Sequence, residues 1–311
     1  MGFIAATLFL YFVISTVFLV AKINFSDTEK FLDPTNKWGG RALRYLSRTS
    51  IAFCLFFVTT ANAETLEVPG TGASQLLLRD LARAFEAKNV DLRLVIPHSI
   101  GSRGGIRALT QGKTKAARIS RSLTDTEKRR GLRAIYFAVS PVVFITHPSV
   151  QEVTSVSPED IVSIYSGNIK SWEPLGGPPR KLYPVTRDSG SVLGAVRAAI
   201  EGFPDAKLPI AKPVPSIIDM VEAVQSHPFT IGFSTLNLAR SHNVNILKFN
   251  DMAADEHAAI TEAYPINVRF GLALKDVDDP TLTRFIDFLY SETASAIMRA
   301  HGTLPLPRKH N

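Results

Sequence analysis

The sequence predicts an α/β protein with largely parallel sheets, preceded by an export region. After residue 63, short apolar stretches with the pattern of strands alternate with stretches whose apolar residues recur every three or four positions, as in helices. Hydrophobic residues make up 45% of the chain, and its one cysteine, Cys54, lies in the export region. The exported part must therefore fold around a hydrophobic core without disulfides.

The elements follow in a regular order. Residues 65–68 form a first strand, which ends in the turn Pro69–Gly72, and a helix begins at Ser74, a residue type that caps helix N-termini. Leu92, Leu94 and Ile96 alternate as in a strand, and a small-residue loop and a short helical stretch with Ile106 and Leu109 come next. The same reasoning predicts strands at 116–119, 136–146, 182–186, 230–233, 244–249 and 267–274, and helices from Thr124, from Ser157, from Ser191, at 216–226 and at 282–300, the last closed by Gly302.

The clearest helix start is Ser157-Pro158-Glu159-Asp160. It combines a capping serine, a proline at the first helical position and an acidic residue three positions after the serine. These residues predict a capping box.

The first 63 residues have the pattern of an export region. Residues 2–21 are uncharged and mostly apolar, which is enough for a transmembrane helix because about 20 residues span the hydrocarbon layer. A second apolar run, 51–58, follows three arginines and precedes Ala61-Asn62-Ala63, which predicts a signal peptide over about 41–63. Two interpretations of the first run stay open: a real helix, or upstream sequence included by a misplaced start.

Charge sets the expected compartment. The loop between the two apolar runs has six basic and three acidic residues, so we expect it to stay cytoplasmic and residues 64–311 to be periplasmic. A retained first helix would tether them to the inner membrane, as their only membrane contact. Without residues 1–63 the net charge falls from +7 to +4, which does not indicate a nucleic-acid partner.

Three loops share one design, in which small hydroxyl or glycine residues directly precede a helix. They are Gly70–Ser74, Ser99–Gly105 and Ser189–Ser191. A helix N-terminus offers free N–H groups and the positive end of the helix dipole, and hydroxyls add donors without bulk. The third loop also has Arg187, whose planar guanidinium can bind an oxyanion through two hydrogen bonds. Together these loops predict an anion site.

Over residues 65–308 the sequence resembles the phosphate-binding proteins of ABC phosphate transporters, a branch of the type II periplasmic binding proteins. The segments that carry the resemblance occur in the family's order: Gly70-Thr71-Gly72-Ala73-Ser74, Ile100-Gly101-Ser102-Arg103-Gly104-Gly105-Ile106, Ser157 to Trp172, Thr186-Arg187-Asp188-Ser189-Gly190-Ser191 and Ile231-Gly232-Phe233. The resemblance implies two lobes of mixed sheets flanked by helices, with a ligand cleft between them. Lobe I would comprise 64–144 plus 236–311, and lobe II 145–235.

By position, the resemblance also implies the ligand-binding residues. Ser74 gives the hydroxyl of the first loop and Gln75 a backbone N–H, while Ser102 gives the hydroxyl of the second loop. Across the cleft, Arg187 and Ser191 form the clamp and its hydroxyl. The predicted set is Ser74, Gln75, Ser102, Arg103, Ser120, Arg187 and Ser191.

Two departures from the family bear on the ligand. The loop with Arg187 can be aligned with the family in two ways. In the first, Val192 and Leu193 follow Ser191 where the family continues with Gly-Thr. In the second, Ser189-Gly190-Ser191 is aligned with the family's Ser-Gly-Thr. Ser120 stands where the family has an aspartate that accepts the proton of monohydrogen phosphate and so rejects sulfate. Arg118 and Arg121, on either side of it, either add positive charge to the cleft or lie on the surface at a strand end.

The leading functional hypothesis is an exported, monomeric solute-binding protein. It would capture phosphate or a similar oxyanion by closure of two lobes and present it to an ABC permease. The alternatives are a membrane-anchored sensing ectodomain that signals to a partner protein, the binding of a different anion, and a hydrolase. We expect no catalytic residue, cofactor or metal, because no Gly-x-Ser-x-Gly, His-Glu-x-x-His or phosphate-loop motif occurs and the seven histidines are scattered.

Overall fold

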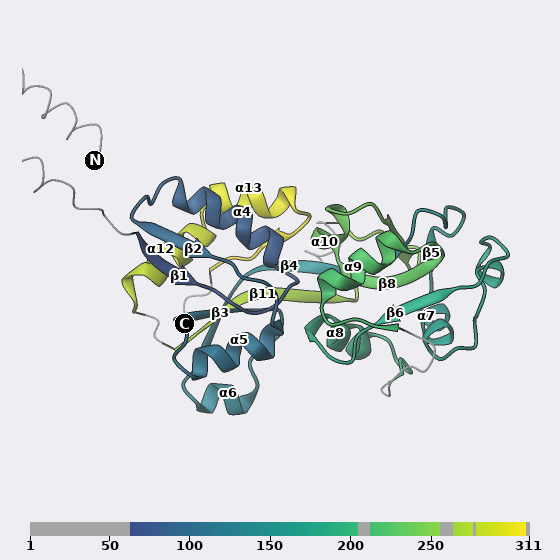
Figure 1. The fold of residues 1–311 in the computed structure, drawn as a ribbon, viewed down its shortest axis with the longest axis horizontal. Coiled ribbons are helices and arrows are strands. Elements are labelled where there is room, and N and C mark those ends of the chain that lie inside the picture. The colour runs from purple at the N-terminus through teal and green to yellow at the C-terminus, as the bar shows by residue number, and fades with distance from the viewer. Residues whose placement is uncertain (1–62, 205–211, 256–263, 276–277, 309–311) are drawn as a thin grey trace, which may run out of the picture. The chain divides into compact units, whose positions relative to one another are not determined.

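The computed structural model describes residues 63–204, 212–255, 264–275 and 278–308 (Figure 1). These belong to one unit, residues 63–311, which is described here by itself. The predicted apolar runs 2–21 and 51–58 and the signal peptide lie outside the described residues. Among the residues described, no helix is both long enough and apolar enough to cross a membrane.

The N-terminal elements alternate between strand and helix as predicted. They are β1 (Glu64–Glu67), α4 (Gln75–Glu86), β2 (Leu92–Val95), α5 (Gly101–Thr110), β3 (Ala116–Ile119) and α6 (Asp125–Arg129). Helix α4 forms because its apolar residues recur on one side, and Leu77, Leu78, Leu81 and Phe85 of that side are fully buried. Phe85 packs edge-on against Phe285, with the ring centroids 5.4 Å apart.

The 14-residue strand β4 (Arg133–Thr146) connects two groups of elements. Its first part pairs antiparallel with β11 (Asn267–Leu274), and its last part, Val142–Thr146, pairs antiparallel with β8 (Thr230–Thr235) (Figure 1). It begins three residues before the predicted 136, because pairing with β11 extends to Arg133.

The elements on the far side of β4 form what we call the second group. They are β5 (Ser155–Val156), α7 (Pro158–Tyr165), the 3-10 helix η2 (Glu173–Leu175), β6 (Tyr183–Thr186), α8 (Ser191–Ala199), β7 (Lys212–Pro213), α9 (Ile217–Ser226), β8, α10 (Leu236–Arg240), β9 (Asn245–Ile246) and β10 (Lys248–Phe249). The capping box predicted for α7 is confirmed. Ser157 Oγ accepts a hydrogen bond from Asp160 N at 3.1 Å, and Asp160 Oδ2 accepts one from Ser157 N at 2.9 Å.

The sheets are mixed, as the family resemblance implied, rather than largely parallel. Strand pairs β1–β2, β6–β8, β6–β7 and β5–β10 are parallel, whereas every partner of β4 runs antiparallel to it. The alternation of strands and helices fails as a predictor here because β4 pairs with two strands that are distant in the sequence, β8 and β11, and runs antiparallel to both although helices lie between them in the chain.

The predicted strand 244–249 is two short strands with different partners. β9 pairs with Ile145 and Thr146 of β4, and β10 pairs with β5. The partner of β9 is the last part of β4, and the partner of β10, β5, is the next strand after β4 in the chain.

The C-terminal elements are α12 (Pro280–Leu289), α13 (Glu292–Ala300) and β12 (Leu304–Pro305). We call them, together with the elements from β1 to α6 and β11, the first group. The prediction of one helix over 282–300 was wrong, because Ser291 starts a new helix by accepting a hydrogen bond from Ala294 N at 3.2 Å. Gly302 ends α13 with a positive φ of 64°.

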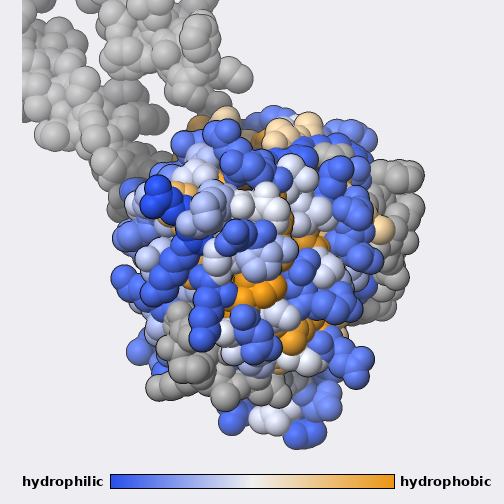
Figure 2. Space-filling model, turned by 90° about the vertical axis from the view of Figure 1, so that its right-hand side faces the viewer, coloured by the Kyte–Doolittle hydropathy of each residue, from blue (hydrophilic) through white to orange (hydrophobic). Residues whose placement is uncertain are grey.

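Figure 2 shows the surface at the end of the unit formed by the second group. Hydrophilic residues dominate this face, and the hydrophobic ones form separate spots among them. Large hydrophobic side chains that are exposed in the described residues include Tyr183 and Ile246 of this group. Scattered apolar residues of this kind are usual on protein surfaces.

The capping box of α7 gives a test of this local structure. Ser157→Ala removes the hydroxyl that bonds Asp160 N, so we expect the free energy of unfolding to fall by about 0.5–2 kcal/mol. Urea unfolding measures the change. The matched control is Ser163→Ala within the same helix, which should leave stability unchanged or raise it, because alanine is the better helix former. Equal effects of the two substitutions would contradict the assigned cap.

Candidate functional site

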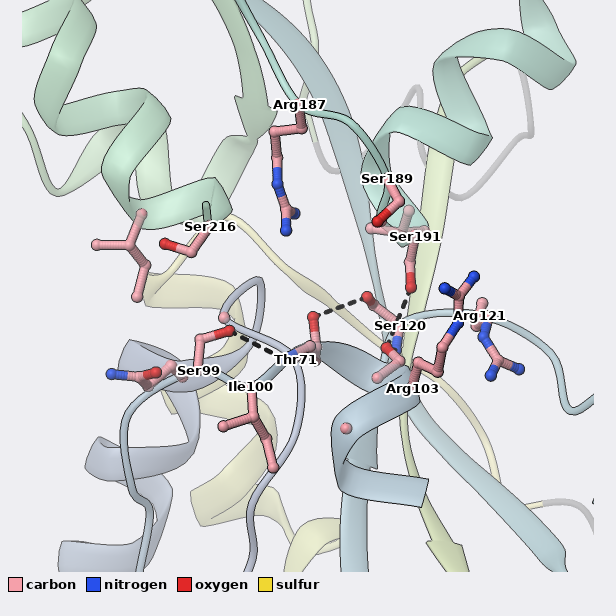
Figure 3. Close-up of a pocket in the computed structure, with 18 of the residues that line it drawn as sticks. Thr71, Ser99, Ile100, Arg103, Ser120, Arg121, Arg187, Ser189, Ser191 and Ser216 are labelled. Carbon is pink, nitrogen blue, oxygen red and sulfur yellow. Dashed lines mark hydrogen bonds between the residues drawn. The ribbon is translucent and has the colours of Figure 1, made fainter. Parts of the chain in front are cut away.

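A cleft of about 1680 Å³ lies where the two groups meet (Figure 3). The first group contributes the loops before α4 and α5 and the end of β3, and the second group contributes the loop before α8 and the start of α9. The polar residues that line it include Thr71, Gln75, Ser99, Ser102, Arg103, Ser120, Arg121, Arg187, Ser189, Ser191 and Ser216. Hydroxyl and guanidinium groups therefore dominate the site.

The first loop is held against β3 by a close backbone approach. Gly70 has a φ of 145°, and a Cβ at this position would lie 2.0 Å from the carbonyl oxygen of Arg118, so only glycine fits. Thr71 N donates to that same oxygen at 3.1 Å. This pairing brings Thr71 Oγ1 to 3.0 Å from Ser120 Oγ, and both residues line the cleft.

Within this loop, Thr71 rather than Ser74 presents its side chain to the cleft. Ser74 is fully buried, its Oγ bonds to none of the described residues, and it does not line the cleft. The predicted N–H donor, Gln75 N, is engaged in the loop itself, since it donates to Gly72 O at 3.0 Å. Sequence reasoning missed Thr71 because Ser74 has the helix-capping position, although Thr71 belongs to the same small-residue loop. The ligand role of Ser74 stays a prediction.

The second loop leads into α5 and places Ser102 at the centre of the cleft. Ser102 is only 5% exposed, and its Oγ accepts a hydrogen bond from Ser120 N at 3.1 Å. The same Oγ lies 3.1 Å from Ser191 Oγ of the second group. Arg103 is exposed and lines the cleft beside Ser102. These hydrogen bonds bring together Ser102, Ser120 and Ser191, the last two of which are labelled in Figure 3.

The arginine loop lies on the opposite side of the cleft. Arg187 Nη2 donates to Pro215 O at 2.8 Å, while its buried Nε bonds to none of the described residues. A Cβ on Gly190 would lie 2.7 Å from Arg187 Nη1, so the glycine leaves room for the guanidinium. Burial lowers the pKa of Arg187, and the nearby carboxylate of Asp219 opposes that shift. Arg187 lines the cleft, and the end of its guanidinium points into it (Figure 3).

The residues after Ser191 do not belong to the cleft. Val192 and Leu193 are 2% and 1% exposed and pack in the hydrophobic core, whereas Ser189 and Ser191 both line the cleft. Of the two alignments considered for this loop, the geometry favours the one that places Ser189-Gly190-Ser191 at the site.

The two arginines that flank Ser120 have different surroundings. Arg121 lines the cleft, and its two terminal nitrogens each donate to a carboxylate oxygen of Glu127 at 2.8 Å. Hydrogen bonds from Arg121 are the main cause that lowers the pKa of Glu127 to about 2. Arg118, in contrast, is fully buried and does not line the cleft. Neither is therefore an unpaired surface arginine directed at a ligand.

The arrangement is suited to binding an anion. Neutral hydroxyls, the guanidinium of Arg187 and the N-terminus of α8 supply hydrogen-bond donors and positive potential. Two carboxylates also line the cleft, Asp219 and Glu222, and Asp219 Oδ2 already accepts a hydrogen bond from Ser216 N at 2.8 Å. Across the part of the chain that the structure describes, no three His, Cys, Asp or Glu side chains gather as a metal site would require.

Comparisons with known proteins find one family model and several phosphate-binding proteins that are similar to this chain. A family model described as a PBP superfamily domain matches residues 58–293. The phosphate-binding protein PstS of Borreliella burgdorferi is 28% identical over 256 residues, which cover 78% of this chain and 90% of that protein. PstS of Bacillus subtilis is 24% identical over 255 residues, with 78% and 81% covered.

Solved structures share the fold. One from Clostridium perfringens, described as a phosphate ABC transporter substrate-binding protein with bound phosphate, has a TM-score of 0.73 and 22% identity. An ABC-type phosphate transport receptor from Vibrio cholerae has a TM-score of 0.61 and also 22% identity. Each match covers 78% of this chain and 100% of the other.

The Arg121–Glu127 pair predicts a pH dependence of stability. The pKa of Glu127 is lowered from 4.5 to about 2, so its ionised form stabilises the fold above pH 4.5, and this stabilisation is lost as the pH falls toward 2. We expect Glu127→Gln to reduce the loss of stability between about pH 5 and pH 3, measured by urea unfolding. The control Glu201→Gln removes an exposed carboxylate and should keep the wild-type slope. An unchanged slope for Glu127→Gln would contradict the assigned pair.

Proposed function

The chain belongs to the PBP superfamily, and from that premise we propose that it is an exported solute-binding protein that captures phosphate and delivers it to an ABC permease. The observation that carries this proposal is the meeting of Ser102 and Ser191, 3.1 Å apart, beside Arg187 in one cleft. The names of its relatives, phosphate-binding proteins and a phosphate transport receptor, support the same ligand. The proposed activity is binding without chemical conversion.

The proposed binding mode uses donors from both groups. Phosphate enters between Ser102 and Ser191, replaces their mutual hydrogen bond and accepts one from each hydroxyl. Arg187 supplies the charge-assisted bonds from the second group, and Thr71 supplies a hydroxyl from the first. Hydrogen bonds to charged groups contribute about 1.5–3 kcal/mol each, so a few of them account for micromolar affinity, which corresponds to about 8 kcal/mol.

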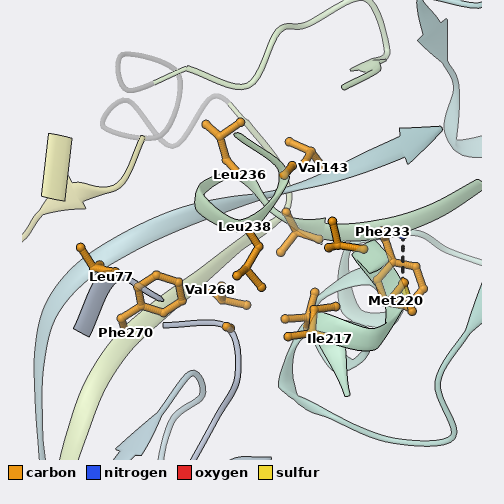
Figure 4. Packing of buried hydrophobic residues seen from close by; sticks show 14 of the residues in the cluster. Leu77, Val143, Ile217, Met220, Phe233, Leu236, Leu238, Val268 and Phe270 are labelled. Atoms are coloured by element: carbon orange, nitrogen blue, oxygen red, sulfur yellow. Dashed lines mark hydrogen bonds between the residues drawn. The ribbon is translucent and has the colours of Figure 1, made fainter. Parts of the chain in front are cut away.

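We propose that the two groups are the two lobes, which close by a hinge motion. Lobe I comprises 64–144 and returns at β11, and lobe II begins at 145. The sequence-based division ended lobe II at 235. We propose to extend lobe II to about residue 252, which the pairing of β9 with Ile145 and Thr146 and of β10 with β5 supports. One buried hydrophobic cluster includes residues of both groups, among them Phe270, Leu236 and Phe233 (Figure 4). The hinge therefore lies over a packed core that includes β4 and β11.

The discrimination between oxyanions depends on Ser120. Its Oγ shares a hydrogen bond with Thr71 Oγ1 at 3.0 Å. A serine hydroxyl can donate a hydrogen bond as well as accept one, whereas an ionised carboxylate only accepts and repels an oxyanion that has no proton to donate. We therefore propose that the site selects against fully ionised oxyanions less strongly than a site with a carboxylate at this position.

Calorimetric titration tests the function. The chain is stripped of bound ligand and titrated with phosphate and, separately, with sulfate at low salt. We expect micromolar or tighter binding of phosphate and weaker but measurable binding of sulfate. Binding of neither ion would contradict the proposed function. Binding of phosphate with complete rejection of sulfate would contradict only the role given to Ser120.

Arg187 provides the corresponding variant. Arg187→Ala removes the guanidinium from the cleft, and we expect phosphate affinity to fall at least about 30-fold, because the loss of one charge-assisted pair costs about 2–5 kcal/mol. Arg93→Ala is the control, since Arg93 is exposed on β2 and does not line the cleft. Circular dichroism should show both variants folded. Unchanged affinity in folded Arg187→Ala would rule out this clamp.

The proposed export of the protein to the periplasm depends on its N-terminal region. We propose that the signal peptide at about 41–63 directs export to the periplasm and that the helix at 2–21, where it is retained, tethers the protein to the inner membrane.

A further inference from the structure

The guanidinium of Arg118 lies buried directly beneath the two loops of the first group. The residue, on β3, is 0% exposed. Its nitrogens donate to the carbonyl oxygens of Val68, Thr71 and Pro97 and to Gln75 Oε1, with distances of 2.6 Å to Thr71 O, 2.7 Å to Pro97 O and 3.2 Å to Gln75 Oε1. All of these acceptors are neutral oxygens.

These bonds connect Arg118 to both loops at once. Val68 directly precedes the turn Pro69–Gly72 and Thr71 lies within it, at the first loop, while Pro97 lies two residues before the second loop. The main chain of Arg118 adds to the connection, since its N–H donates to Pro69 O at 2.9 Å and its carbonyl accepts from Thr71 N at 3.1 Å. The position of Thr71 therefore depends on Arg118 from two sides.

The charge of Arg118 has no direct counter-ion in the part of the chain that the structure describes. None of its hydrogen-bond partners is a carboxylate, and no ion pair includes it. Burial, with a smaller effect of Arg79, lowers its pKa to about 10, and Glu67 opposes this shift. Arg118 thus stays protonated at neutral pH. A buried charge of this kind is unfavourable unless another charge compensates it.

We propose that the anion in the cleft is the charge that compensates Arg118, so that this residue sets the affinity for phosphate without touching it. The inference rests on the proposed function. Arg118 reaches the site through Thr71, whose hydroxyl lies 3.0 Å from Ser120 Oγ on the cleft surface. The attraction between a buried cation and an anion extends beyond hydrogen-bonding distance, and salt screens it less than it screens the attraction between two exposed charges. Arg118 is therefore a positioning residue that also has an electrostatic role.

The test separates charge from structure with two substitutions. Arg118→Lys keeps the charge but loses the planar fork, whereas Arg118→Met loses both and keeps most of the volume. Calorimetry measures the affinity of each variant for phosphate. We expect Arg118→Lys to bind within about threefold of wild type and Arg118→Met to bind at least about tenfold more weakly than wild type. The difference between the two variants should persist in 0.5 M NaCl, where the Debye length is about 4 Å. Arg93→Met removes the same charge from an exposed position on β2 and should leave affinity unchanged.

Each outcome has a definite meaning. Equal losses in Arg118→Lys and Arg118→Met would overturn the electrostatic role and leave only a structural one. Wild-type affinity in both would overturn the inference entirely. If the wild-type protein binds neither phosphate nor sulfate, the proposed function fails, and this inference fails with it.

A measurement on the wild-type protein covers the case in which Arg118→Met does not fold. The Nε–H resonance of Arg118 is followed by NMR during a phosphate titration. We expect a shift of this resonance and slower exchange with solvent as the anion binds, because the anion stabilises the buried cation and the closed loops. A resonance and an exchange rate that phosphate leaves unchanged would overturn the inference.

Discussion

The close approach of Gly70 to the main chain of Arg118 is the constraint on which the geometry of the cleft depends. A side chain at position 70 would collide with the Arg118 carbonyl at 2.0 Å, so only glycine lets the first loop lie against β3. This contact places Thr71 beside Ser120, and Ser120 N in turn holds the hydroxyl of Ser102. The polar surface on the first group is therefore one connected network rather than separate loops.

Strand β4 brings the second half of the site to that network. Because one continuous strand pairs with β11 at one end and with β8 at the other, the loops at the ends of neighbouring strands face each other across it. The contact between Ser102 and Ser191 is the visible result. A ligand between Ser102 and Ser191 would contact both groups at once, which is the arrangement that the proposed hinge closure requires.

Local patterns in the sequence were sufficient for some features and insufficient for others. The capping box at Ser157 depends on neighbouring residues only, and so do the small-residue loops, the arginine loop and most element positions. The break at Ser291, the mixed pairing of β4 and the partners of β9 depend on tertiary contacts that no local pattern contains. The burial of Ser74 and Arg118 could not be predicted for the same reason, since the depth of a side chain depends on which strands pack around it. Thr71 was within reach, because it shares its loop with Ser74, but helix capping directed attention to the latter.

A crystal structure of the chain grown with saturating phosphate tests the central claim most directly, because it locates the anion relative to both groups. We expect a tetrahedral anion within hydrogen-bonding distance of Ser102, Ser191 and Arg187, with the direct hydrogen bond between the two serines broken. Thr71 should contact the anion, and Arg118 should remain buried behind it. An anion bound elsewhere, or a bond between Ser102 and Ser191 that persists with the cleft empty at saturation, would contradict the proposed site.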